Sequence, residues 1–153
     1  MHALLAMIRG FPTALLSRMR RSGLRDREQL FRTLFDQSGD SNLLLDHERF
    51  FDCNEATVRL LRATNREQVL GRQPAELSPE FQPDGRRSAE KAEEIIAAAF
   101  REGSQRFEWM HRRLDGSTLW VEVLLTVIPW RGRRILHTTW RDITQRKHAE
   151  AAL

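Results

Sequence analysis

At 153 residues the chain is long enough for one domain with a buried core, and 41% hydrophobic with 30% charged residues is typical of a soluble globular protein. The net charge of +4 is concentrated in residues 1–35, which hold seven arginines against Asp26 and Glu28, whereas residues 36–153 hold 18 basic against 19 acidic residues. A nucleic-acid-binding protein needs a basic face on its folded surface, so this distribution argues against nucleic acid as a partner.

The sequence contains few groups that could form a catalytic or metal site. Cys53 is the only cysteine, which excludes an internal disulfide and fits a reducing, cytoplasmic setting. The histidines are scattered, so no metal site is predicted. No phosphate-binding loop, nucleophile elbow or His-Glu-x-x-His pair is present, which argues against an enzyme. A small-molecule enzyme of the α+β roll type stays as a minor alternative, with His111 as its one candidate acid or base.

Residues 1–24 combine apolar residues at helical spacing with several arginines. This segment is too short and too charged for a transmembrane helix, which needs about 20 apolar residues. Its charges follow its apolar part, unlike those of a signal peptide. A helix on a membrane surface is one interpretation, but Arg18 interrupts the apolar stripe, so a helix that packs on the body or on a partner subunit is favoured. Gly23 is expected to break the chain.

The next part of the chain predicts a helix and two short strands. Residues 25–37 carry apolar side chains on one side of a helix, and the turn residues 38–41 end it. Residues 42–46 and 49–52 are short apolar runs that favour strands.

Two short helices are expected after these strands. Asn54 is a good N-cap for a helix over residues 55–62, and Asn65 for one over residues 66–70. Three prolines make residues 74–83 irregular.

Residues 88–101 form the clearest helix in the sequence, and Gly103 ends it. Charged residues occupy one side of this helix and an apolar stripe the other. The stripe consists of Ala92, Ile95, Ile96, Ala99 and Phe100.

The strongest strand signal lies in residues 119–127, where every second residue is aliphatic and many are β-branched. The opposite face carries Trp120, Leu124 and Ile128, which indicates that this face is also partly covered. Pro129 lacks a backbone donor and should mark the end of the strand or an edge.

Two further strands should flank this one in an antiparallel meander. Residues 105–113 precede it through a hairpin turn at residues 114–117, and residues 134–143 follow it after a turn at residues 131–133. Residues 145–153 are helical again. This order predicts an α+β domain in which helices gather on one face of a five-stranded antiparallel sheet.

Four motifs, in this order, resemble the sequence signature of PAS sensor domains. They are Asp52-Cys53-Asn54-Glu55-Ala56, Glu67-Gln68-Val69-Leu70-Gly71, Arg112-Arg113-Leu114-Asp115-Gly116 and Trp140-Arg141-Asp142-Ile143-Thr144-Gln145-Arg146-Lys147. The resemblance covers residues 27–147 and implies the PAS fold with an N-terminal helical extension. It divides the chain into a basic amphipathic helix (1–24), a PAS domain with a leading helix (25–144, helix 25–37) and the start of a C-terminal signalling helix (145–153).

PAS domains are similar in holding a small ligand between the inner face of the sheet and the helices, so the resemblance implies a pocket here. His111 and Thr138 are its polar candidates. Trp109 and Trp140 can instead fill the space, so a self-packed dimerisation module without ligand is an open alternative. With the alternation typical of the family, the predicted pocket residues are Phe107, Trp109, His111, Val121, Val123, Leu136, Thr138 and Trp140.

The resemblance also bears on the cofactor. Haem-binding PAS domains use a histidine on the long helix, and residues 88–101 contain none, so haem is not expected. Members that bind flavin covalently use a cysteine in an Asn-Cys-Arg-Phe-Leu-Gln motif, which this sequence lacks. Non-covalent flavin and another small organic ligand both stay open.

Asp142, Ile143 and Thr144 lie where the last strand meets the exit helix, and the resemblance implies that this joint transmits the signal. An acidic residue near a helix N-terminus is favoured by the helix dipole, and Asp142 is expected to cap the helix or to pair with an arginine of residues 112–113. The chain stops within this helix, so we expect a fragment of a larger protein. The usual outputs of the family are a histidine kinase or a diguanylate cyclase.

Apolar residues outside the core predict a homodimer, since a large apolar patch is rarely left in water. The leading helix or a second subunit should cover the outer face of the sheet. The predicted interface residues are Leu30, Phe31, Trp120, Leu124, Ile128 and Ile135.

Overall fold

The computed structural model of the chain describes residues 13–153, which fall into two units divided between Phe35 and Asp36. The first unit consists of α2 (Thr13–Gln37) up to Phe35, and α2 is one continuous helix. The expected break at Gly23 is therefore wrong. A glycine inside a helix costs only about 1 kcal/mol of helix stability relative to alanine. A long helix on both sides of the glycine can tolerate this cost. The part of the predicted helix in residues 1–12 lies outside the described residues.

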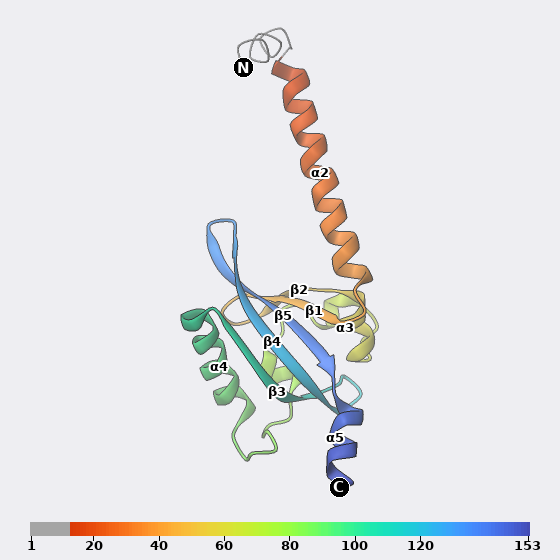
Figure 1. The fold of residues 1–153 in the computed structure, drawn as a ribbon, viewed down its shortest axis with the longest axis vertical. Helices are drawn as coiled ribbons and strands as arrows, with labels where there is room; N and C mark the ends of the chain where they lie inside the picture. The colour runs from red at the N-terminus through yellow and green to blue at the C-terminus, as the bar shows by residue number, and fades with distance from the viewer. Residues whose placement is uncertain (1–12) are drawn as a thin grey trace. The chain divides into compact units, whose positions relative to one another are not determined.

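The second unit is built on a five-stranded antiparallel sheet, as expected (Figure 1). Its strands lie in the order β2-β1-β5-β4-β3, so the first strand in sequence pairs with the last. The strands are β1 (Ser41–Leu45), β2 (Phe50–Cys53), β3 (Ser104–Arg112), β4 (Thr118–Trp130) and β5 (Arg133–Asp142).

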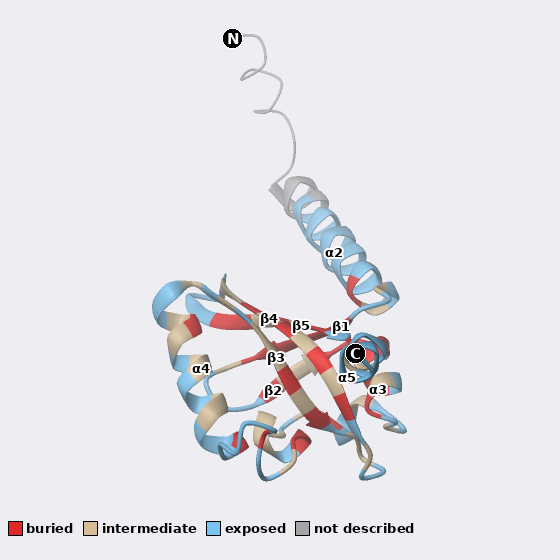
Figure 2. Ribbon diagram, turned by 60° about the horizontal axis from the view of Figure 1, so that its bottom comes forward, coloured by how far each residue is buried: buried red, intermediate tan, exposed pale blue. Residues whose placement is uncertain are grey.

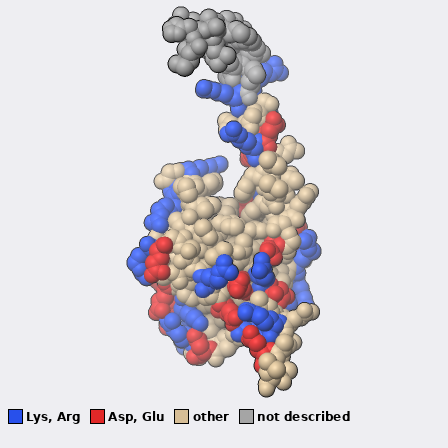
Figure 3. All heavy atoms as spheres, in the orientation of Figure 1, with Lys and Arg blue, Asp and Glu red and all other residues tan. Residues whose placement is uncertain are grey.

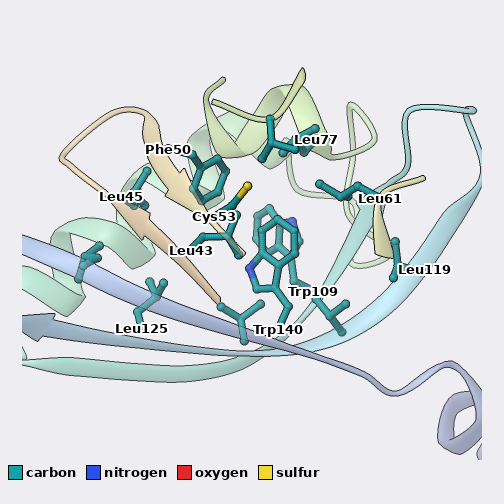
Figure 4. Close-up of a cluster of buried hydrophobic side chains, with 14 of the residues drawn as sticks. Leu43, Leu45, Phe50, Cys53, Leu61, Leu77, Trp109, Leu119, Leu125 and Trp140 are labelled. Carbon is teal, nitrogen blue, oxygen red and sulfur yellow. The ribbon is translucent and has the colours of Figure 1, made fainter. Parts of the chain in front are cut away.

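Short helices and one longer helix pack on one face of this sheet, and the core lies between the two layers (Figure 4). The expected helix over residues 66–70 is only a short 3-10 helix, and the Asn65 side chain makes no capping hydrogen bond. A final helix, α5, continues from β5. The helical segments are α3 (Glu55–Leu60), η1 (Arg66–Gln68), η2 (Pro74–Leu77), α4 (Ser88–Glu102) and α5 (Thr144–Ala151).

Asn54 caps α3 as predicted and also ties the helix to the sheet. Its Oδ1 accepts hydrogen bonds from the backbone nitrogens of Thr57 (3.1 Å) and Asn42 (3.0 Å), and its Nδ2 donates to the carbonyl oxygen of Asp40 (2.9 Å). The side chain is fully buried. One asparagine therefore joins the start of β1 to the start of α3.

The period-two pattern of β4 decides which face of the sheet meets the helices. Leu119, Val121, Val123 and Leu125 are buried in the core cluster, whereas the residues between them are partly exposed. Figure 2 shows buried residues along the strands, while the described part of α2 before Phe35 is exposed. The sheet therefore presents an apolar inner face to α4 and the short helices.

Charged side chains of both signs are interspersed over the face of the second unit that Figure 3 shows. This mixture agrees with the near-neutral charge of residues 36–153. None of the helices in the described residues is both long enough and apolar enough to cross a membrane.

Candidate functional site

A small cavity lies between the inner face of the sheet and α4, with a volume of about 40 Å³. Its walls are almost entirely apolar, and no Asp, Glu, Lys or Arg lines it. The lining residues are Leu45, Phe50, Pro74, Ala92, Ile95, Ile96, Phe107, Trp109, His111, Val123, Leu125, Thr138 and Trp140.

Six of the eight predicted pocket residues line this cavity. The other two, Val121 and Leu136, are fully buried in the core cluster but do not line it. Their positions along the sheet explain why they do not line the cavity. Val121 pairs with Asp142 at one end of β5, and Leu136 pairs with Val127 towards the other end. The row between them, where Val123 pairs with Trp140, does line the cavity.

The sequence-based prediction missed the lining residues that lie outside the last three strands. Ala92, Ile95 and Ile96 come from α4, and the apolar stripe of that helix was the signal that could have found them. Leu45 and Phe50 come from β1 and β2, which reach the cavity because β1 pairs with β5. The order of strands in the sheet is not visible in the sequence pattern alone.

His111 contributes a neutral imidazole to the cavity. Its Nδ1 lies 2.9 Å from the carbonyl oxygen of Leu77, which can only accept, so Nδ1 carries the proton and donates. Burial lowers the pKa of His111 to about 4, and the hydrogen bond to Leu77 opposes this change. The other ring nitrogen, Nε2, is therefore an acceptor at neutral pH, and it has no hydrogen-bond partner.

Thr138 supplies the second polar atom without a partner. Its side chain is 1% exposed, and Oγ1 makes no hydrogen bond. Its cross-strand neighbours are Leu43 on β1 and Leu125 on β4, neither of which has a polar side-chain atom. Buried side-chain polar atoms are nearly always paired, so each exception calls for an explanation.

Two large aromatic side chains, Trp109 and Trp140, line the cavity and lie close together within the buried cluster (Figure 4). The indole nitrogen of Trp109 donates to Ser78 Oγ (2.9 Å), which fixes the position of this ring. Trp140 lies between two other rings, with centroid distances of 3.9 Å to His111 and 5.7 Å to Phe50. The small volume of the cavity follows from these large, fixed aromatic side chains.

An open groove of about 530 Å³ lies next to the cavity on the surface of α4. Pro74, Ala92 and Ile96 line both the groove and the cavity, so they separate the two spaces. The groove is more polar, since its walls also include Glu48 and Glu93.

The predicted transmission residues form the joint between β5 and α5. Asp142 Oδ1 accepts a hydrogen bond from the backbone nitrogen of Thr144 (2.9 Å), the first residue of α5, although the N-cap position itself is Ile143. Ile143 donates its backbone N–H to the carbonyl oxygen of Trp120 on β4 (3.0 Å). The expected pairing of Asp142 with residues 112–113 is wrong, because the Arg113 guanidinium donates to the carbonyl oxygens of Leu60 and Thr118 and to Ser117 Oγ instead.

A second contact holds α5 against the outer face of the sheet. Glu108 on β3 forms ion pairs with Arg146 (2.7 Å) and Lys147 on α5. The Lys147 ammonium also lies 4.6 Å from the ring centroid of Trp120. Hydrogen bonding from Lys147 holds the pKa of Glu108 below its usual value, so this carboxylate is charged at neutral pH. We call Glu108, Arg146 and Lys147 the α5 tie.

The residues predicted for a dimer interface differ in how much surface they offer. On α2, Leu30 is 59% and Phe31 is 51% exposed. Trp120, Leu124 and Ile128 are half-buried on the outer face of β4. Ile135 is only 1% exposed within the chain itself, so its assignment to the interface is wrong.

The sequence pattern of the PAS domain family matches residues 39–145 of this chain. A methyl sulfide methyltransferase-associated sensor from Methanosarcina acetivorans is 30% identical over 132 residues. This match covers 84% of the chain but only 12% of the relative, so the chain spans about one eighth of that protein.

Two solved structures have the same fold. The PAS domain of an HTR-like protein from Haloarcula marismortui is 26% identical, with a TM-score of 0.71 over 82% of this chain and 99% of that one. The PAS domain of a LuxR-family transcriptional regulator from Burkholderia thailandensis, solved in complex with ethanol, is 20% identical. Its TM-score is 0.59, over 74% of this chain and 96% of that one.

Proposed function

The chain belongs to the PAS domain family, and from this premise we propose that it is a sensory domain that binds a small ligand between its sheet and α4. The observation that carries the proposal is the cavity lined by two buried side chains that each have a polar atom without a partner, His111 Nε2 and Thr138 Oγ1. An unpaired buried polar group costs about 1–3 kcal/mol. A ligand that satisfies either atom would recover part of that free energy.

The volume of the cavity favours a very small ligand. Pockets for drug-sized ligands have volumes of roughly 300–1,000 Å³, so a cavity of about 40 Å³ supports neither haem nor flavin. The similar domain from Burkholderia thailandensis, solved with ethanol, supports a ligand on this scale.

The signal would leave through α5, towards an output domain of kinase or cyclase type. Trp140 lines the cavity and lies on β5, two residues before Asp142, whose side chain accepts a hydrogen bond from the first residue of α5. A ligand that moves Trp140 would therefore act on the strand that leads directly into α5. The α5 tie on the opposite face of the sheet would hold the helix until that strand moves.

The apolar face of α2 supports a homodimer. Leu24, Leu30, Phe31 and Leu34 are each more than half exposed and fall within one side of the helix. Such a row of large apolar side chains is typical of a helix that packs against another helix. The half-buried residues Trp120, Leu124 and Ile128 on β4 would add a second apolar surface.

A self-packed module without ligand is the second candidate, and the volume that Trp109 and Trp140 fill is the observation that favours it. In that case ordered water would occupy the cavity, and the chain would act through dimerisation alone.

Absorption spectroscopy of the purified protein, followed by mass spectrometry of what denaturation releases, tests the proposal. We expect no flavin or haem band. Because so small a ligand binds weakly, the protein is equilibrated with about 10 mM ethanol, and headspace gas chromatography should then find that denaturation releases bound ethanol. The Val123→Phe variant, which places a ring in the cavity, is expected to release none. Equal release from both proteins would locate the molecule elsewhere and contradict the proposal.

A further inference from the structure

We propose that the ligand is an uncharged molecule of about two to four non-hydrogen atoms that bears a hydroxyl or amide group, and that this group hydrogen-bonds the Thr138 hydroxyl. This inference rests on the proposed function and adds the chemical class of the ligand and the residue that recognises it.

The size of the ligand follows from the free space. A single water needs roughly 10–15 Å³ on the measure used for such cavities, and a cavity of about 150 Å³ holds benzene. The space of about 40 Å³ therefore accepts a molecule of a few non-hydrogen atoms. The fixed indole of Trp109, whose nitrogen donates to Ser78, prevents this space from expanding on that side.

The absence of charge on the ligand follows from the lining. Among the residues that line the cavity, all of them in the described part of the chain, His111 is the only titratable one. Its Nε2 is an acceptor, so it cannot donate to a carboxylate or a phosphate. No carboxylate is present to pair with a cation. A charged ligand would lose its hydration without gaining a partner.

The unpaired hydroxyl of Thr138 is the reason to expect a polar group on the ligand. The hydroxyl can donate one hydrogen bond and accept others, and its cross-strand neighbours Leu43 and Leu125 offer it neither. A hydroxyl on the ligand can pair with it in either direction, and an amide offers both an acceptor and a donor. A purely apolar ligand, such as a short alkane, would leave the buried hydroxyl unpaired. A ligand that reaches further would find a second acceptor in His111 Nε2.

The affinity of such a ligand has a ceiling. The best small ligands gain no more than about 1.5 kcal/mol per non-hydrogen atom. A molecule of three such atoms therefore binds with a Kd no lower than the order of 1 mM. The domain would respond to a compound that accumulates to millimolar concentration.

Two pairs of matched probes test the ligand class by NMR titration of the whole chain, over a range of about 1–100 mM. Ethanol and fluoroethane have the same size, but fluoroethane lacks the hydroxyl. Acetamide and acetate have the same size, but acetate is charged. The indole N–H signals of Trp109 and Trp140 report on the cavity, and those of Trp120 and Trp130 serve as controls because they do not line it.

Thr138→Val removes the hydroxyl and keeps the shape of the side chain. Thr139→Val is the matched control, because Thr139 is the next residue of β5 and does not line the cavity. We expect ethanol and acetamide to shift the Trp109 and Trp140 signals in a saturable way, and fluoroethane and acetate to have at most a fifth of their affinity. Thr138→Val should weaken the binding of ethanol about five- to tenfold, whereas Thr139→Val should leave the affinity for ethanol unchanged. Thr138→Val should fold at least as stably as the wild type, because its hydroxyl has no partner to lose.

Equal binding of ethanol and fluoroethane, binding of acetate, or an unchanged ethanol affinity in Thr138→Val would overturn the proposal. A larger or charged molecule released by denaturation would also overturn it, while the proposed sensory function would stand. If no probe binds and only water occupies the cavity, both the ligand class and the ligand-binding function fail.

Discussion

The buried, apolar surroundings of His111 change the protonation of its side chain. The imidazole is 3% exposed, its Nδ1 donates to Leu77, and burial lowers its pKa to about 4. In the unfolded chain the pKa of a histidine is near 6.5. The folded state therefore binds fewer protons than the unfolded state between these two values, and stability must fall as the pH falls through this window.

We expect the free energy of unfolding to decrease by about 3 kcal/mol between pH 7 and pH 4 through His111 alone. Urea unfolding at several pH values measures this change. His137, whose pKa burial also lowers, contributes with the same sign. The His111→Gln variant isolates the effect, since its free energy of unfolding should change less with pH, and the difference from the wild type is the contribution of His111. An equal slope in wild type and variant would show that His111 titrates normally.

Asn54 and Asn65 give a second test at the scale of single residues. Both were predicted as helix caps from the same rule, yet only Asn54 makes capping hydrogen bonds. Asn54→Ala should destabilise the domain by about 2–4 kcal/mol, because it leaves the buried backbone nitrogens of Asn42 and Thr57 without partners. Asn65→Ala should change stability by less than about 0.5 kcal/mol. Similar losses in denaturant unfolding for both variants would contradict this account.

At the scale of elements, α5 is held by exposed charges and by the hydrogen bond from its first residue, Thr144, to Asp142. Glu108, with a side chain that is 36% exposed, pairs with Arg146 and Lys147. Exposed ion pairs contribute little to overall stability. Their effect should therefore be visible in the local opening of α5 rather than in the melting temperature.

Glu108→Gln should raise the hydrogen-exchange rates of the α5 amides about two- to fivefold, and added salt should produce a similar change in the wild type. Glu122→Gln is the matched control, because Glu122 pairs with Arg106 on the same sheet and not with α5. An α5 that exchanges equally fast in all three proteins would mean that the tie does not hold the helix.

The elements also show where sequence patterns are informative. Alternation along residues 119–127 correctly predicted the buried face of β4, because the side-chain period of a strand is two whatever the fold. The break at Gly23 was wrong, because local propensity is a weak prior that a long helix overrides. The 3-10 geometry of residues 66–68 was also missed, since the short segment does not continue into a full helix.

At the scale of the whole molecule, the fold was predictable and the free space inside it was not. Motifs and alternation placed His111, Thr138 and Trp140 on one face, and all three line the cavity. The volume that remains depends on how Trp109 and Trp140 are oriented, and contacts such as the one with Ser78 decide this. Ser78 is 31 residues away from Trp109 in the sequence, so no local pattern indicates the contact.

The exposed apolar face of α2 predicts a homodimer, and this prediction can be tested directly. We expect the wild type to have twice the 17.9 kDa mass of one chain in light scattering, because a second copy would remove the exposed Leu30, Phe31 and Leu34 side chains from water. Leu30→Asp combined with Leu34→Asp should weaken the dimer at least tenfold, since each change places a carboxylate in an apolar contact. Gln29→Asp adds a similar charge at an exposed position on the opposite side of the same helix and should leave the mass nearly unchanged. A monomeric wild type, or a double variant that stays dimeric, would show that α2 does not form the interface and would leave the outer face of β4 as the surface to test, through Leu124→Asp.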